Sequence, residues 1–149
     1  MPIAQLNWQP LVAQLKVPAQ PVGGVWTCAL EYVVGPRKIK IAATGSWSVI
    51  DKLKVVGPDG DSQDWDSSQA LLFPGAARGV LVAKIGGGTS DKVGNIFPVG
   101  QKTVIDLTDP STVSSSPPVR GCLFLAMNDD PKNFVRHSGE IAVDVWEAC

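Results

Sequence analysis

The sequence predicts an all-β protein, a two-sheet antiparallel β-sandwich of the jelly-roll type formed as a single domain by residues 1–149. Three observations predict this fold class. Several short segments alternate apolar and polar residues with the period of a half-buried strand. Turn-forming residues separate these segments, and the chain contains 15 glycines and 12 prolines, which break helices. A chain of 149 residues is long enough to bury one hydrophobic core.

Six segments have the pattern of a β-strand. They are residues 25–34, 39–44, 79–85, 103–107, 121–127 and 139–146. Residues 140–145 alternate strictly, which indicates one face in the core and one in solvent. Residues 121–127 are almost continuously apolar, which indicates a central strand covered on both faces. Residues 9–16 are the one segment for which a short helix is an alternative.

Glycine and proline mark the turns between these strands. The turn signals lie at residues 35–36, 57–61, 74–75, 86–88, 109–110 and 117–118. The glycines at 86–88 are not followed by the Lys-Ser/Thr of a phosphate-binding loop, so a hairpin loop is the better interpretation. Residues 111–118 are polar and end in two prolines, which is typical of an exposed loop within one domain.

Composition and charge exclude some classes of function. The net charge is −1 and the mean hydropathy is +0.11, whereas a nucleic-acid-binding domain needs a basic face. No apolar run approaches the roughly 20 residues of a membrane-spanning helix. The first residues lack a basic segment followed by an apolar one, so a cytoplasmic location is expected, with non-classical export as the alternative.

Three cysteines, Cys28, Cys122 and Cys149, are widely spaced and form no CxxC or CxxH unit. A zinc site is therefore not expected. Cys28 and Cys122 lie in apolar, strand-like runs, so we expect both to be buried free thiols.

The chain contains no recognisable catalytic motif. It has one histidine, His137, and no GxSxG sequence, so a Ser-His-Asp hydrolase is not expected. Asp64 lies beside Trp65 in an acidic segment. Such a loop is typical of sugar-binding surfaces, because the indole stacks on a sugar face and carboxylates accept hydrogen bonds from hydroxyls. Alternatively, Trp65 packs into the end of the sandwich. We expect a binding protein and not an enzyme.

The segment of residues 128–139 lies between two predicted strands and is rich in oxygen-bearing side chains. Carboxylate, amide and backbone oxygens of such a loop can hold a hard cation such as calcium. The alternative is a hairpin loop in which Asn and Asp residues stabilise turns.

Around this loop the sequence resembles the LecA-type bacterial lectins over residues 39–145. The similar residues are 45–47, 57–61, 79–86, 97–99, 125–129 and 138–145. The most specific elements are Leu-Val-x-Lys-Ile-Gly at residues 81–86 and the pair Asn128-Asp129 followed by Ser138-Gly139. The resemblance implies a β-sandwich lectin that binds galactose through calcium and forms oligomers. Residues 1–25 match poorly, and the segment 100–120 is longer than in the family.

The resemblance also implies where the site lies. Asp129 falls on the aspartate that contacts both calcium and sugar in the family. Asn133 and Ile50 fall on positions whose backbone oxygens bind calcium. Asp64 and Ser67 fall on the family's sugar-contacting histidine and glutamine.

Arg136 and His137 depart from the family, because they fall on two calcium-binding asparagines. Arginine has no acceptor atom, and calcium prefers oxygen to a histidine nitrogen. We therefore expect Arg136 to pair with Asp129 in the place of calcium, so that no calcium is bound. In the alternative, Asp130 supplies a replacement oxygen and a weaker calcium site remains.

The expected function is that of a carbohydrate-binding, lectin-like protein with galactose-type specificity and a degenerate calcium site. The expected pocket consists of Asp64, Trp65, Ser67, Asp129, Asn133, Arg136 and His137. The alternative is a lectin scaffold that has lost sugar and calcium binding and acts as an interaction module. A dimer or tetramer is expected, because the C-terminal strand is apolar at Val143, Val145 and Trp146 and could pair its edge or bury its face against a second chain.

Overall fold

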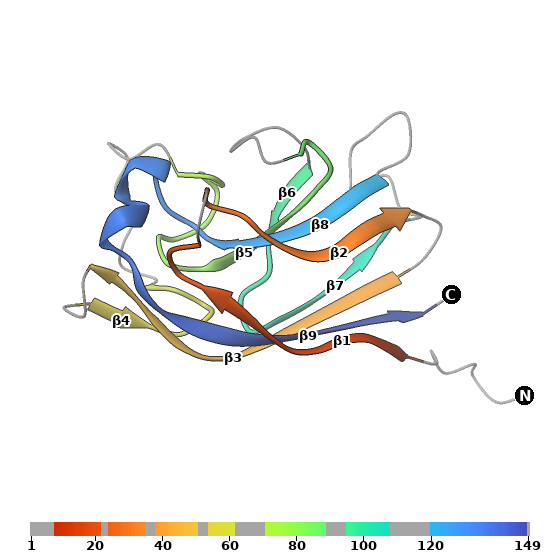
Figure 1. Cartoon of the computed structure of the whole chain (residues 1–149). Coiled ribbons are helices and arrows are strands. Elements are labelled where there is room, and N and C mark those ends of the chain that lie inside the picture. Colours follow the sequence, from red (N-terminus) through yellow and green to blue (C-terminus); the bar gives the residue numbers. More distant parts are fainter. Residues whose placement is uncertain are drawn as a thin grey trace, which may run out of the picture.

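The computed structural model describes residues 8–21, 24–34, 38–50, 54–61, 71–88, 95–107 and 120–148. They form two antiparallel sheets that face each other (Figure 1). The first sheet has the order β1 (Gln9–Pro18), β9 (Ser138–Ala148), β3 (Lys38–Ile50) and β4 (Lys54–Val56), and β7 (Lys102–Asp106) also pairs with β3. The second sheet has the order β2 (Thr27–Val34), β8 (Arg120–Met127), β5 (Leu81–Ile85) and β6 (Asn95–Pro98).

The predicted all-β sandwich is confirmed, and the six predicted strands correspond to β2, β3, β5, β7, β8 and β9. The helical alternative for residues 9–16 is wrong, because β1 pairs with β9 from Gln9 to Pro18. β1 is an edge strand and is mostly exposed, so it lacks the apolar alternation that marks the other strands. β4 and β6 have only 3 and 4 residues, which is too short to show a period.

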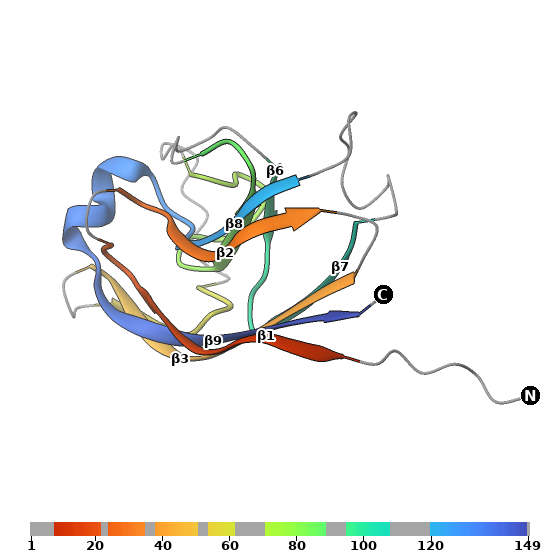
Figure 2. The same ribbon diagram turned by 45° about the vertical axis from the view of Figure 1, so that its right-hand side comes forward.

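Strand β9 lies inside the first sheet, between β1 and β3 (Figure 2). Its alternate residues Ile141, Val143 and Val145 are at most 1% exposed and belong to the core. The expectation that this strand offers a free edge to a second chain is therefore wrong. Strand β8 is buried on both faces from Leu123 to Met127, as predicted for residues 121–127.

The turns that the sequence predicts at residues 57–61 and 74–75 are present. In the first, Gly60 donates its N–H to the carbonyl of Gly57 at 3.0 Å. Gly60 has φ +68°, and a Cβ at this position would lie 2.5 Å from the backbone nitrogen of Val80, so the turn requires glycine. The turns predicted at residues 35–36, 109–110 and 117–118, and the loop at 111–118, lie outside the described residues.

Between β8 and β9 the chain forms η1 (Pro131–Arg136), a 3-10 helix in the segment that the sequence predicts to be a loop. Asp130 caps it by accepting the N–H of Lys132 at 3.2 Å, and Pro131 occupies the first helical position. Both features favour a helix start. Within the described part of the chain, no helix is long and apolar enough to cross a membrane.

Cys28 and Cys122 are free thiols, but Cys28 is exposed and Cys122 is partly exposed. The prediction that both are buried is therefore wrong. Cys28 pairs with Phe124 across β2 and β8, while the neighbouring Leu123 and Leu125 fill the core. Cys28 consequently lies on the outer face of the second sheet, because successive residues of a strand point to opposite faces.

Candidate functional site

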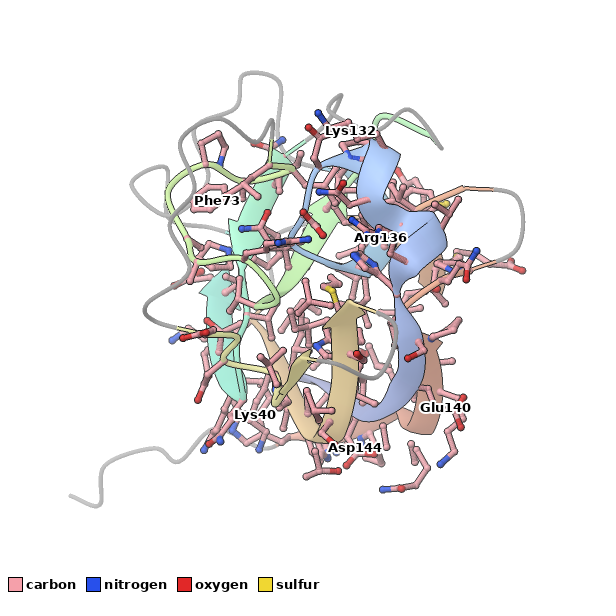
Figure 3. The ribbon with its side chains drawn as sticks, turned by 90° about the vertical axis from the view of Figure 1, so that its left-hand side faces the viewer. Lys40, Phe73, Lys132, Arg136, Glu140 and Asp144 are labelled. Atoms are coloured by element: carbon pink, nitrogen blue, oxygen red, sulfur yellow. The ribbon has the colours of Figure 1, made fainter. Side chains whose placement is uncertain are left out.

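The end of strand β8 carries two buried polar residues. Asn128 and Asp129 follow Met127 directly, and each is 0% exposed. η1 then leads to His137, which is 2% exposed. Figure 3 shows this end of the sandwich, with η1 on one side and the loop that contains Phe73 facing it. Polar groups buried in this way require hydrogen-bond partners.

Both carboxylate oxygens of Asp129 are engaged by nitrogen atoms. Oδ1 accepts hydrogen bonds from the backbone N–H of Asp130 at 2.7 Å and from Nδ2 of Asn133 at 3.0 Å. Nε of Arg78 lies 3.0 Å from the same oxygen. Oδ2 lies 2.7 Å from Nε2 of His137. The Nε–H of Arg78 is not aligned with Oδ1, so this contact is an ion pair rather than a hydrogen bond.

The imidazole of His137 connects Asp129 to the segment that follows β1. Its Nδ1 lies 3.0 Å from the carbonyl oxygen of Ala19, which can only accept a hydrogen bond. Nε2 faces a second acceptor, the Asp129 carboxylate, so both ring nitrogens lie within hydrogen-bond distance of an oxygen. The ring of Phe134 packs on the imidazole with 4.4 Å between centroids. The poorly matched N-terminal region therefore contributes Ala19 to the site.

The surroundings of Asp129 favour its ionised form. Burial by itself would raise the pKa of this carboxyl group. The hydrogen bonds from His137, Asn133 and the backbone of Asp130, together with the charge of Arg78, outweigh burial and lower the pKa below its usual value. The site is thus a buried carboxylate balanced by cationic and N–H groups.

Asn128 positions the loop that carries Arg78. Its Oδ1 accepts the N–H of Phe73 at 2.8 Å, and its Nδ2 lies 2.9–3.1 Å from the carbonyl oxygens of Phe73, Ala76 and Ala77. The backbone carbonyl of Asn128 also accepts the N–H of the glycine that follows Arg78, at 2.8 Å. The side-chain amide and the backbone carbonyl of Asn128 together fix both ends of residues 73–79 beside Asp129.

The sequence predicts an ion pair between Arg136 and Asp129, and this prediction names the wrong arginine. Arg136 is exposed at the end of η1, whereas the guanidinium beside Asp129 belongs to Arg78, whose side chain is 12% exposed. Arg78 lies far from residues 128–139 in the sequence, so inspection of that loop alone could not have found it. The turn at residues 74–75 was the one sequence signal that a loop ends near it.

The residues around Asp129 do not fit a calcium ion. Calcium requires free oxygen ligands, but both oxygens of Asp129 already receive N–H or cationic groups, and the side chain of Asn133 presents its NH₂ to Asp129. Among the residues that the structure describes, no three His, Cys, Asp or Glu side chains come together as metal ligands. Ile50 is placed at the end of β3, opposite Lys54 of β4.

A further feature of this end of the molecule bears on a ligand. A shallow hollow of about 240 Å³ lies where β3, β4 and β9 meet. It is lined by Ser46, Trp47, Ser48, Val55, Ser138 and Gly139. The hollow thus begins at the residue that follows His137. Asp64, Trp65 and Ser67, which the sequence assigns to the pocket, lie outside the described residues.

Comparison with known proteins supports a lectin fold. Neither a scan against protein-family models nor a search of curated proteins returns a match. Among solved structures, the chain is similar to the EclA N-terminal domain, described as a PllA-like lectin, with a TM-score of 0.57 and 21% sequence identity. The alignment covers 91% of this chain and 96% of that domain. The two proteins therefore share the fold of a lectin domain.

Proposed function

We propose that this protein is a carbohydrate-binding lectin that recognises galactose-type sugars without calcium. The observation that carries the proposal is the Asp129 carboxylate at the loop end of a lectin-type sandwich, where the Arg78 guanidinium supplies the positive charge and His137 lies 2.7 Å from the second oxygen. In the family that the sequence resembles, the corresponding aspartate binds sugar through calcium. Here the Arg78 guanidinium balances its charge, and His137 lies within hydrogen-bond distance of it.

Sugar contacts are assigned to the side chains that reach the surface around this buried centre. Asp129 and His137 are buried, so their proposed role is to hold Arg78 and Asn133 in place. Arg136 and Lys132 are exposed on η1. Guanidinium and amide N–H groups donate to sugar hydroxyls. The hollow lined by Ser46, Ser48 and Ser138, which begins next to His137 in the sequence, offers serine hydroxyls as further partners.

Binding rather than turnover is proposed because the acid–base groups of the described site are already committed. Asp129 receives donors on both oxygens, and His137 has a partner at both ring nitrogens. General acid–base catalysis needs a group that can exchange a proton with substrate. Neither residue presents a free atom for that step.

A second candidate is a lectin scaffold that acts through protein contacts, and the outer face of the first sheet favours it. Lys40 lies over the ring of Trp146 at 4.4 Å and over that of Trp8 at 4.9 Å. Val104, which pairs with Lys40, is 46% exposed. With the edge of β9 covered, this face is the proposed contact surface for a dimer or tetramer.

The test is a glycan array probed in millimolar calcium and again in excess EDTA. We expect galactose-terminated glycans to be bound equally in both. Arg136→Gln should weaken binding, because it removes an exposed donor next to the site, and Lys102→Gln on β7 is the matched control. Loss of binding in EDTA would contradict the calcium-free site. Failure to bind any glycan would favour the interaction module.

A further inference from the structure

Cys28 and Cys122 lie on the same face of two neighbouring strands. Cys28 on β2 is opposite Phe124 on β8, and paired residues share a face of the sheet. Cys122 precedes Phe124 by two residues on the same strand, so it shares that face as well. The two cysteines are therefore diagonal neighbours on the outer face of the second sheet, away from the site at Asp129.

Cys122 faces the strand that carries Cys28. Cys122 donates its Sγ–H to the carbonyl oxygen of Glu31 at 3.0 Å, three residues after Cys28 on β2. Burial, followed by the neighbouring Cys122 and the charge of Glu31, raises the pKa of Cys28. Because the thiolate is the reacting form, a raised pKa means that Cys28 reacts faster at mildly alkaline pH.

The strand that carries Cys28 can adjust to a covalent bond. β2 is the edge strand of its sheet, and its pairing with β8 is interrupted between Cys28 and Leu30 and again between Leu30 and Val33. Bulges of this kind bend a strand locally and increase its twist. Diagonal neighbours in a sheet lie about 7–8 Å apart, and a disulfide requires Cβ atoms within about 4.5 Å. The bond therefore requires a backbone shift, for which the irregular edge strand β2 is the suitable element.

We propose that Cys28 and Cys122 form an oxidation site, at which a hydroperoxide converts the two thiols into an intramolecular disulfide. The exposed Cys28 thiolate attacks one peroxide oxygen, so that an S–O bond forms and the O–O bond breaks. The leaving oxygen takes a proton and departs as water or alcohol. The Cys122 thiol then attacks the sulfenic sulfur of Cys28. The S–S bond forms, and the sulfenic hydroxyl leaves with the thiol proton as water. The two thiols lose two electrons, and the peroxide gains them.

This inference does not rest on the proposed sugar site, and its test uses the full chain with Cys149→Ser. Only Cys28 and Cys122 then remain. The folded protein is treated with a small excess of hydrogen peroxide at mildly alkaline pH, unfolded in iodoacetamide and weighed intact. We expect a mass lower by two hydrogen atoms, no added carbamidomethyl group and a peptide that links residues 28 and 122.

The expected bond forms within one chain, so its rate is independent of protein concentration. The matched control, Cys28→Ser in the same background, should keep one alkylatable thiol or add oxygen at it; native tryptophan fluorescence verifies its fold. The proposal is overturned if the two-cysteine protein takes up oxygen without an internal bond, or forms disulfides only between chains. It is also overturned if the bond forms only after unfolding in urea.

Discussion

Substituting Arg78 and Arg136 in turn tests which of these two arginines balances the charge of the buried Asp129 carboxylate. Arg78→Gln removes the guanidinium whose Nε lies 3.0 Å from Oδ1 of Asp129. Arg136→Gln removes a similar charge that is exposed on η1. The two substitutions are chemically identical and lie at the same end of the molecule. They differ only in whether the arginine contacts the buried carboxylate.

The magnitude follows from what remains around Asp129 after each change. Breaking a buried ion pair costs about 3–5 kcal/mol when the remaining charge has no other partner. In Arg78→Gln the carboxylate keeps the hydrogen bonds from His137, Asn133 and the Asp130 backbone. We therefore expect a smaller loss of about 2–3 kcal/mol, the value of one interaction with a charged group. Arg136→Gln, on the surface, should change stability by less than about 0.5 kcal/mol.

Thermal and urea unfolding at pH 7, followed by tryptophan fluorescence, measure the difference. For a domain of this size, about 2–3 kcal/mol corresponds to a melting temperature lower by about 4–12 °C. Asp129→Asn and the double variant with Arg78→Gln complete a thermodynamic cycle, in which we expect a coupling above about 0.5 kcal/mol. The reasoning is refuted if Arg136→Gln destabilises the protein as much as Arg78→Gln, or if the coupling is zero.

Three further outcomes follow from the same site. Because the pKa of Asp129 is lowered in the folded state, its ionised carboxylate stabilises the fold. This contribution is complete at pH values above the pKa of the unfolded state, about 3.9, and is lost as pH falls toward the pKa of the folded state. The stability gap between wild type and Asp129→Asn should therefore narrow below about pH 4 in urea titrations, and a constant gap would contradict the assignment. Because the donors around Asp129 leave calcium no free oxygen, the melting temperature should differ by less than about 1 °C between millimolar calcium and excess chelator, whereas a drop of several degrees in chelator would show that the native loop binds metal. Asn128→Ala leaves the carbonyl groups of three loop residues without their amide donor, and it should cost about 3 kcal/mol or more and accelerate proteolysis within residues 71–80. Cleavage at an unchanged rate would mean that the loop does not depend on this amide.

The strands that form the core were predictable from local sequence. Ile141, Val143 and Val145 alternate with polar residues in β9, and β8 is continuously apolar because both its faces are covered. Such patterns depend on which side of a strand meets the core, so they are visible without knowledge of its neighbours. Strand β1 escaped prediction because it is held by backbone pairing with β9 while its side chains remain mostly exposed.

Part of the candidate site was equally local. A cluster of Asn and Asp between two strands marked Asp129, Asn133 and His137, and the structure brings these three together. The cluster could not indicate which cationic residue balances the charge of Asp129. A guanidinium can reach the carboxylate from any loop that folds over the sandwich end, and Arg136, the nearer arginine in the sequence, points to solvent instead.

Only the tertiary structure decided the long-range contacts. Arg78 meets Asp129 because Asn128 holds the loop of residues 73–79 against the end of β8. Cys28 and Cys122 lie on neighbouring strands because β2 pairs with β8, in an interrupted register that no periodicity encodes. Side-chain patterns report the burial of each strand, whereas register and loop placement depend on hydrogen bonds between residues far apart in the chain.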